Sequence, residues 1–374
     1  MALAFEQGPI RPPSEAHSLL IRLTRNCPWN RCAFCNAYKG TTFSVRTVED
    51  IKKDIDTIAE MSRLIARVSQ GNDTDGLQSK LYESGEFQLY HVANWLASGG
   101  KTVFLQDGNS MLLKTAALLE ILAYMKEKLP TVERITSYAR SDTLLRKSVD
   151  ELAQLKQAGI SRVHVGLESG CDEVLKFMDK GVTAQQHIDA GKRVKESGIS
   201  LSEYILLGLG GRKWAKEHPF DTARVLSAIN PDYIRLRTLA IVENTPLYTK
   251  MQQGAWEEQP DANIVEEEKI LIENLNGIES RLLSDHSMNL LGEINGNLPH
   301  DKPAMLQVID RFLALPETEK NNFILGKRWG LYNKLNDLQD PERHARVENT
   351  LQKLQSQGTL EATIANLKYQ MVRV

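Results

Sequence analysis

The chain has 374 residues, of which 41% are hydrophobic and 25% are charged, so its composition is that of an ordinary globular protein. Its 46 basic and 48 acidic residues leave a net charge of −2, which argues against a nucleic-acid partner held by a general basic surface. No stretch is apolar for long enough to span a bilayer, and the first residues lack the pattern of a secretory signal, so we expect no membrane partner.

Over residues 19–241, short apolar runs alternate with amphipathic helical stretches, a pattern typical of parallel β/α units. Thr47-Val-Glu-Asp50 is typical of a helix amino terminus. Gly159 and Gly198 each follow a predicted helix and suit a left-handed backbone at its end. Six strands are predicted, over residues 18–24, 102–106, 134–138, 162–167, 200–207 and 233–239.

The first β/α unit is long, because a polar loop over 70–76 and a further helix over 86–97 precede the second strand. After about residue 259 we predict no strand, only helices, over 266–284, 302–315, 317–325 and 341–355. The expected fold is therefore α/β, a partial TIM-type (β/α)6 barrel over residues 1–259 with an α-helical C-terminal extension over residues 260–374.

In such a barrel the carboxyl ends of the strands carry the chemistry, and the first strand leads into a cysteine motif. Cys27, Cys32 and Cys35 have the spacing C-x4-C-x2-C. Three thiolates on one loop suit an iron–sulfur cluster or zinc, and with a cluster they would leave a fourth iron open to a substrate or cofactor. Structural zinc would need a fourth ligand, and no histidine follows closely after Cys35.

The phrase from Cys27 to Cys35 resembles the signature of the radical S-adenosylmethionine (radical SAM) superfamily, with Phe34 at the aromatic position before the third cysteine. Four residues separate the first two cysteines, one more than the family usually has. The resemblance covers about residues 18–245 and implies that the three cysteines hold a 4Fe–4S cluster that binds S-adenosylmethionine (SAM).

The resemblance also implies the reaction. An electron donor such as flavodoxin or ferredoxin would reduce the cluster, SAM would be cleaved to a 5′-deoxyadenosyl radical, and that radical would abstract hydrogen from a substrate. An oxygen-sensitive cluster in a chain without a targeting signal implies a cytoplasmic location.

The same resemblance assigns further residues to SAM. Asp107 follows the second strand and is expected to accept from the SAM ammonium group, with a plain Asp-Gly turn as the alternative. Arg140 follows the third strand and is expected to meet the SAM carboxylate or an acidic substrate, with a structural salt bridge as the alternative. The phrase ending in Glu168-Ser169 resembles the fourth strand of relatives of oxygen-independent coproporphyrinogen oxidase, which implies a contact of Glu168 or Ser169 with the SAM ribose.

Three later positions complete the expected site. Gly208 lies in a glycine cluster that lacks the full dinucleotide pattern and better matches the fifth-strand motif near the SAM adenine. Arg237, on the sixth strand, either points into the site or supports it. A loop over 284–289 would offer His286 or Asn289 to the substrate, although a lone histidine is more often structural.

Cys171 stands near a helix amino terminus, where the pKa of its thiol would be lowered, unless it is simply a small buried residue. Because only one three-cysteine motif is present, we expect a radical SAM enzyme acting on a small molecule. The alternatives are a non-catalytic cluster or haem carrier on the same scaffold, and a nucleic-acid- or protein-modifying member of the superfamily. Fold and motif do not name the substrate.

Overall fold

The computed structural model describes residues 3–69, 77–83 and 85–372. By their contacts the residues form two compact units. Unit 1 comprises Met1–Asn30, Ala37–Val165 and Arg193–Leu201, and unit 2 comprises Arg31–Asn36, Gly166–Lys192 and Ser202–Val374. The division expected at residue 259 falls inside unit 2 and stays a prediction, and the polar loop expected over 70–76 lies outside the described residues.

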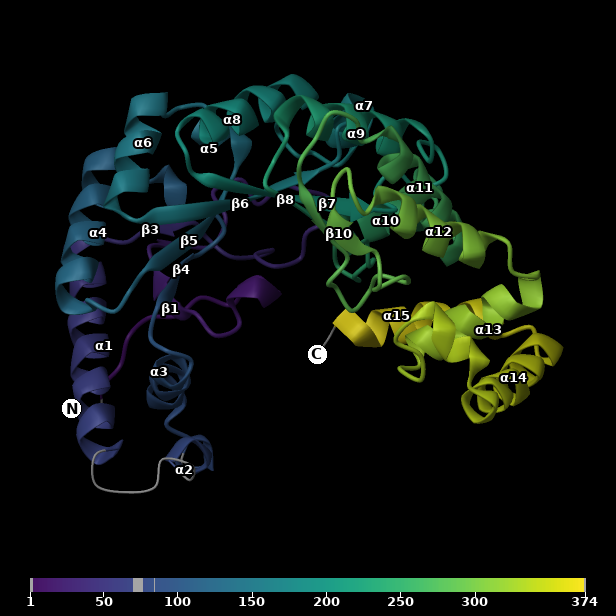
Figure 1. Ribbon diagram of the computed structural model, residues 1–374, viewed down its shortest axis with the longest axis horizontal. Coiled ribbons are helices and arrows are strands. Elements are labelled where there is room, and N and C mark those ends of the chain that lie inside the picture. The colour runs from purple at the N-terminus through teal and green to yellow at the C-terminus, as the bar shows by residue number, and fades with distance from the viewer. Residues whose placement is uncertain (1–2, 70–76, 84, 373–374) are drawn as a thin grey trace. The chain divides into compact units, whose positions relative to one another are not determined.

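Unit 1 is built on parallel strands flanked by helices. Strands β1, β4, β5 and β6 pair in parallel in this order, and helices α1, α4 and α6 lie side by side along one face of them (Figure 1). The elements are β1 (Leu19–Arg22), β2 (Thr24–Arg25), β3 (Ser44–Val45), α1 (Val48–Ser69), α2 (Leu77–Glu83), α3 (Phe87–Ala97), β4 (Thr102–Gln106), α4 (Thr115–Lys128), β5 (Arg134–Ala139), α5 (Ser141–Leu144), α6 (Val149–Ala158) and β6 (Ile160–Glu168), which runs on into unit 2.

The local signals of unit 1 explain these elements. The Thr47 hydroxyl accepts from the Asp50 amide at 3.1 Å, so the expected cap begins α1. The middle of β4, Val103-Phe-Leu105, is fully buried, as expected of a parallel strand covered on both faces. The strand predicted over 18–24 is divided, because β2 leaves the parallel sheet and pairs antiparallel with β3.

Unit 2 continues the alternation and ends in helices. Strands β7, β8 and β9 are parallel neighbours, and β10 is antiparallel to β9. Helices α13, α14 and α15 contact one another (Figure 1). The elements are α7 (Asp172–Phe177), α8 (Ala184–Glu196), β7 (Ser200–Leu207), α9 (Glu217–Ile229), β8 (Tyr233–Thr238), α10 (Pro246–Gln252), α11 (Asp261–Asn274), β9 (Arg281–Leu283), β10 (Asn295–Asn297), α12 (Lys302–Leu313), α13 (Glu317–Arg328), α14 (Pro341–Ser356) and α15 (Leu360–Val372).

The mostly parallel strands alternating with helices confirm the expected fold class. The purely helical reading after residue 259 is wrong, because the chain there contains β9 and β10. The helix expected over 266–284 ends at Asn274, and Gly277 turns the backbone with φ of 63°. Residues 281–283 are then extended because β8 pairs with them, a contact between segments about 48 residues apart that local sequence does not reveal.

Candidate functional site

The cysteine motif lies on a loop after β2. Cys27 belongs to unit 1, whereas Cys32 and Cys35 belong to unit 2. None of the three forms a disulfide, and Cys32 is buried while the other two are partly exposed. Asn26 and Asn30 have φ of 68° and 45°, so left-handed turns at two asparagines shape the loop.

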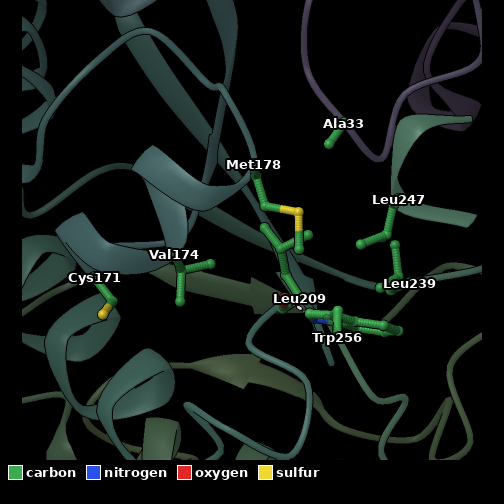
Figure 2. Close-up of a cluster of buried hydrophobic side chains, with 8 residues drawn as sticks. All are labelled: Ala33, Cys171, Val174, Met178, Leu209, Leu239, Leu247 and Trp256. Atoms are coloured by element: carbon green, nitrogen blue, oxygen red, sulfur yellow. Dashed lines mark hydrogen bonds between the residues drawn. The ribbon is translucent and has the colours of Figure 1, made fainter. Parts of the chain in front are cut away.

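The second half of the motif is fixed to unit 2 through Ala33. The Ala33 amide donates to the Met178 carbonyl at 2.8 Å, and its carbonyl accepts from the Leu247 amide at 2.9 Å. Figure 2 shows Ala33 in a buried apolar cluster with Met178, Leu247 and Trp256. Phe34 packs against the same cluster, so the two residues between Cys32 and Cys35 anchor this part of the loop.

Asp107 precedes a glycine that packs on Cys27, and its place in the cofactor site stays a prediction. A Cβ on the next residue, Gly108, would stand 3.5 Å from the Cys27 Cβ and 3.2 Å from the Tyr38 ring. The Asp107 carboxylate is buried and accepts from Arg22 at 2.5 and 2.8 Å and from the Tyr38 hydroxyl at 3.1 Å. Burial, followed by the negative charge of Asp107, raises the pKa of Tyr38, so the phenol stays protonated and donates.

The amino-terminal segment covers Asp107 and was not predicted from the sequence. Gly8 packs on the carboxylate so closely that a Cβ would lie 2.1 Å from Oδ1, and its amide donates to Gln106 at 2.8 Å. Glu6 forms ion pairs with Arg22 at 3.0 Å, Arg25 at 2.7 Å and Arg46 at 3.3 Å. The hydrogen bond from Arg25 is the main cause that holds the pKa of Glu6 below its usual value.

Arg140 contacts the cysteine loop from the end of β5. Its guanidinium lies 5.2 Å from the centre of the Trp29 ring, and its Nε donates to Asp142 at 2.9 Å. The alternative of a structural salt bridge therefore has a partner in Asp142, while the cation–π contact places Arg140 beside the residues that separate Cys27 from Cys32.

Glu168 ends β6 with φ of 63° and is 17% exposed. Its carboxylate accepts from the Lys180 ammonium at 3.1 Å, and a Cβ at Gly166 would meet Glu168 Oε1 at 2.1 Å, so a side chain there would displace the Glu168 carboxylate. The fully buried carboxyl of Glu203 lies within electrostatic range of both. Burial is the main cause that raises the pKa of Glu203, with Lys180 opposing and Glu168 adding to the shift. The sequence offered no signal for Lys180 or Glu203.

Ser169 and Gly208 make contacts inside the protein. The Ser169 hydroxyl is fully buried, lies 2.8 Å from His218 Nδ1 and accepts from the Cys171 amide at 3.0 Å. The Gly208 amide donates to Glu267 at 2.7 Å. Burial lowers the pKa of His218 to about 4 and raises that of Glu267 to about 7.

Arg237 and His286 lie together in unit 2. Arg237 Nη1 donates to Asp285 Oδ1 at 2.9 Å, and its guanidinium lies 5.0 Å from the centre of the Tyr204 ring. Burial and then the positive charge of Arg237 lower the pKa of His286 to about 4, so this imidazole is neutral at pH 7. The Asn289 side chain is turned inward. Its amide nitrogen donates to the Leu236 carbonyl and the Ser284 hydroxyl, and its carbonyl oxygen accepts from the Thr238 hydroxyl. These hydrogen bonds hold the loop on β8.

The activated-thiol reading of Cys171 is wrong. Cys171 is the residue before α7 and is 1% exposed. Burial raises the pKa of its thiol to about 12, which outweighs the helix terminus. The alternative of a small buried residue is confirmed, and Figure 2 shows it in the apolar cluster.

The motif fits a cluster-binding loop in donor type, because it carries three thiols outside disulfides and two of them are partly exposed. Among the residues that the structure describes, no three His, Cys, Asp or Glu side chains already converge as metal ligands. The assignment of the three cysteines to one cluster therefore depends on their spacing and their chemistry.

A family model described as the radical SAM superfamily matches residues 21–220, more than half of the chain. The chain belongs to the radical SAM superfamily. Radical SAM proteins use a 4Fe–4S cluster and SAM, so the two cofactors expected from the cysteine motif are those of the family.

Individual relatives are distant. The chain is 24% identical to a tRNA uridine(34) acetyltransferase of Methanocaldococcus jannaschii over 31% of this chain and 22% of the relative. It is 24% identical to the heme chaperone HemW of Bacillus subtilis over 41% of this chain and 40% of the relative. The chain thus spans less than half of the length of either curated relative.

Among solved structures, coproporphyrinogen III oxidase (HemN) from Escherichia coli aligns with 69% of this chain and 52% of its own, at 16% identity and a TM-score of 0.44.

In the part of this radical SAM chain that the structure describes, none of the helices has both the length and the apolar character needed to cross a membrane.

Proposed function

We propose that this chain is a radical SAM enzyme that holds one 4Fe–4S cluster through Cys27, Cys32 and Cys35 and acts on a small-molecule substrate. The cysteine loop carries this proposal, because three cysteines at C-x4-C-x2-C spacing lie within the matched family region and the loop is anchored through Ala33. Held by the three cysteines, the cluster would supply the one-electron reduction that cleaves SAM, and this chemistry would serve to remove a hydrogen atom from the substrate. A reducing partner of the flavodoxin or ferredoxin kind is part of this proposal.

The chain's own residues would hold and orient SAM. Asp107, which forms an ion pair with Arg22, would accept from the SAM ammonium, and Arg140 beside Trp29 would donate to its carboxylate. Glu168 is the partly exposed carboxylate suited to the ribose hydroxyls.

Other residues of the expected site would support Asp107, Arg140 and Glu168. The buried Ser169 would position Glu168 through the backbone, and Phe34 would shield the loop from water. Gly208 would bring backbone close to the adenine, and Arg237 would point into the site or support the residues that do.

The proposal is tested by SAM cleavage. The protein is reconstituted anaerobically with iron and sulfide, reduced with dithionite, mixed with SAM and assayed for 5′-deoxyadenosine by mass spectrometry. We expect product from the wild-type protein and none from the variant with all three motif cysteines changed to alanine. Wild-type protein with a verified cluster that binds SAM but yields no product under any reductant would contradict an enzymatic role.

A second candidate is a non-catalytic haem carrier, which the similarity to the Bacillus subtilis heme chaperone HemW favours. A carrier would bind haem stoichiometrically and leave SAM intact, so a haem titration followed in the Soret band separates it from the enzyme. The similarity to a tRNA uridine(34) acetyltransferase offers a nucleic-acid-modifying alternative, which the net charge of −2 disfavours.

A further inference from the structure

Strand β8 carries two arginines on one face. Arg235 and Arg237 are two residues apart, so their side chains leave the strand on the same side. Tyr204 on β7 is the register partner of Arg235 and shares this face, whereas Ile234 and Leu236, on the opposite face, are fully buried. The Arg237 side chain is partly exposed, so the face with the arginines is the face of β8 that a ligand can reach.

One acidic residue holds both guanidinium groups. Asp285 forms an ion pair with Arg235 through Oδ2 and accepts from Arg237 through Oδ1 at 2.9 Å. The loop that carries Asp285 is tied to β8, because the Asn289 amide donates to the Leu236 carbonyl at 3.0 Å. The three charged groups are therefore held in place by regular structure and one short loop.

Asp285 does not satisfy every donor of Arg235. Arg235 Nε is a buried nitrogen that has no hydrogen-bond partner among the residues the structure describes. The Arg235 side chain is only 5% exposed, so an unmet donor there is costly. The Arg237 and Asp285 side chains are 12% and 33% exposed, which leaves the cluster open to solvent on the Asp285 side.

The cluster also carries excess positive charge. Two guanidinium groups face one carboxylate, and the nearby His286 adds no charge at pH 7 because burial and Arg237 lower its pKa to about 4. Buried donors with a net positive field are suited to a ligand anion, and the planar guanidinium fork matches a planar carboxylate.

We propose that Arg235 and Arg237 form a binding site for a carboxylate group, which would make the substrate of this chain a carboxylic acid. The assignment to the substrate rests on the proposed function, whereas the anion site itself does not. Asp285 then acts as an internal carboxylate that competes with the ligand for the two guanidinium groups.

The test uses succinate as the probe and a ligand-observed NMR titration of the reconstituted protein. Neutral succinamide and inorganic phosphate are titrated in parallel. Arg235→Gln and Arg237→Gln should each weaken succinate binding by about tenfold or more, because each removes charge-assisted hydrogen bonds. The matched control is Arg224→Gln, an arginine on α9 that is 57% exposed and should leave succinate binding unchanged.

A further variant tests the anion site even if an arginine variant fails to fold. Asp285→Asn removes the internal competitor and leaves both arginines, so succinate should bind about threefold or more tightly. Weaker binding in Asp285→Asn, equal binding in both arginine variants and wild type, or no saturable succinate binding would each overturn the site. Phosphate bound more tightly than succinate with the same dependence on Arg235 would overturn the carboxylate assignment.

Different results would contradict the enzyme proposal and the anion-site proposal. Absence of 5′-deoxyadenosine from the wild-type protein would contradict the enzyme, whatever succinate does. Succinate binding that depends on Arg235 would still establish the anion site.

Discussion

At the scale of single residues, three of the four cysteines are proposed to be ligands of the cluster. Cys27→Ala, Cys32→Ala and Cys35→Ala should each lose most of the bound iron, because three thiolates are the minimum set for the proposed cluster. Cys171→Ala is the matched control, since that thiol is buried and its pKa is raised to about 12. Iron and sulfide analysis after anaerobic reconstitution measures the outcome. A Cys35→Ala protein with a full cluster would refute the ligand set.

The second prediction at this scale concerns Glu168. Glu168→Gln should weaken SAM binding by about tenfold and leave the iron content unchanged, because the carboxylate is proposed to accept from the ribose hydroxyls. Equilibrium dialysis with labelled SAM gives the affinity, and the exposed Glu217→Gln serves as the control. Unchanged SAM affinity in Glu168→Gln would remove this residue from the site.

At the scale of elements, Glu15 fastens the start of the chain to β5 and β6. Burial alone would raise its pKa, but hydrogen bonds involving His164, Arg134 and Ser18 hold the pKa at about 2. A carboxyl with a lowered pKa stabilises the fold above its ordinary value of 4.5, and that stability is lost as the pH falls from 4.5 towards 2.

Glu15→Gln should therefore lower the free energy of unfolding by roughly 3 kcal/mol at pH 7. The difference from the wild-type protein should shrink as the pH falls towards 3. Urea denaturation at several pH values measures this, and a pH-independent difference would show that Glu15 acts by packing alone.

Glu268 on helix α11 has a raised pKa, whereas the pKa of Glu15 is lowered, so the two carboxyls affect stability in opposite directions as the pH rises. Burial and the neighbouring Glu267 and Glu293 raise the pKa of Glu268 to about 8. The wild-type protein should lose stability as the pH rises from 4.5, where this group ionises in the unfolded chain, up to about 8.

Glu268→Gln should remove that loss and raise the free energy of unfolding at pH 8 by roughly 2 kcal/mol or more, with little effect at pH 4.5. Thermal melts at the two pH values test this. A variant less stable than wild type at pH 8 would mean that the ionised carboxyl has a stabilising partner.

The elements predicted from the sequence are those with local signals. Strands β4 and β7 have the predicted bounds, and the glycines at 159 and 198 end helices with φ of 124° and 79° as expected. Strand β9 was missed because its pairing with β8 decides its conformation, and α15 was missed beyond the break at Gly358. Local sequence predicts what local energetics determine, and these two elements depend on distant partners.

The candidate site could likewise be predicted only in part from the sequence. The three cysteines and Phe34 could be identified because they form one short phrase. The Glu6 segment on Arg22, the Lys180 partner of Glu168 and the Asp285 bridge could not, because each joins residues from separate elements. Their charges were visible in the sequence, but their pairing was not.

At the scale of the whole molecule, the radical SAM family and the three-cysteine motif support one account, in which the loop from Cys27 to Cys35 presents a cluster to SAM. Zinc remains the competing metal for three thiols, and it is diamagnetic and redox-inert. A spectroscopic signal from the reduced metal site therefore separates the two.

The most direct test of the account is the electron paramagnetic resonance spectrum of the dithionite-reduced, reconstituted protein with and without SAM. We expect the signal of one reduced 4Fe–4S cluster, a clear change of that signal when SAM is added, and no signal from the triple-cysteine variant. A wild-type signal that SAM leaves unchanged, or a protein that binds zinc and shows no signal, would contradict the account.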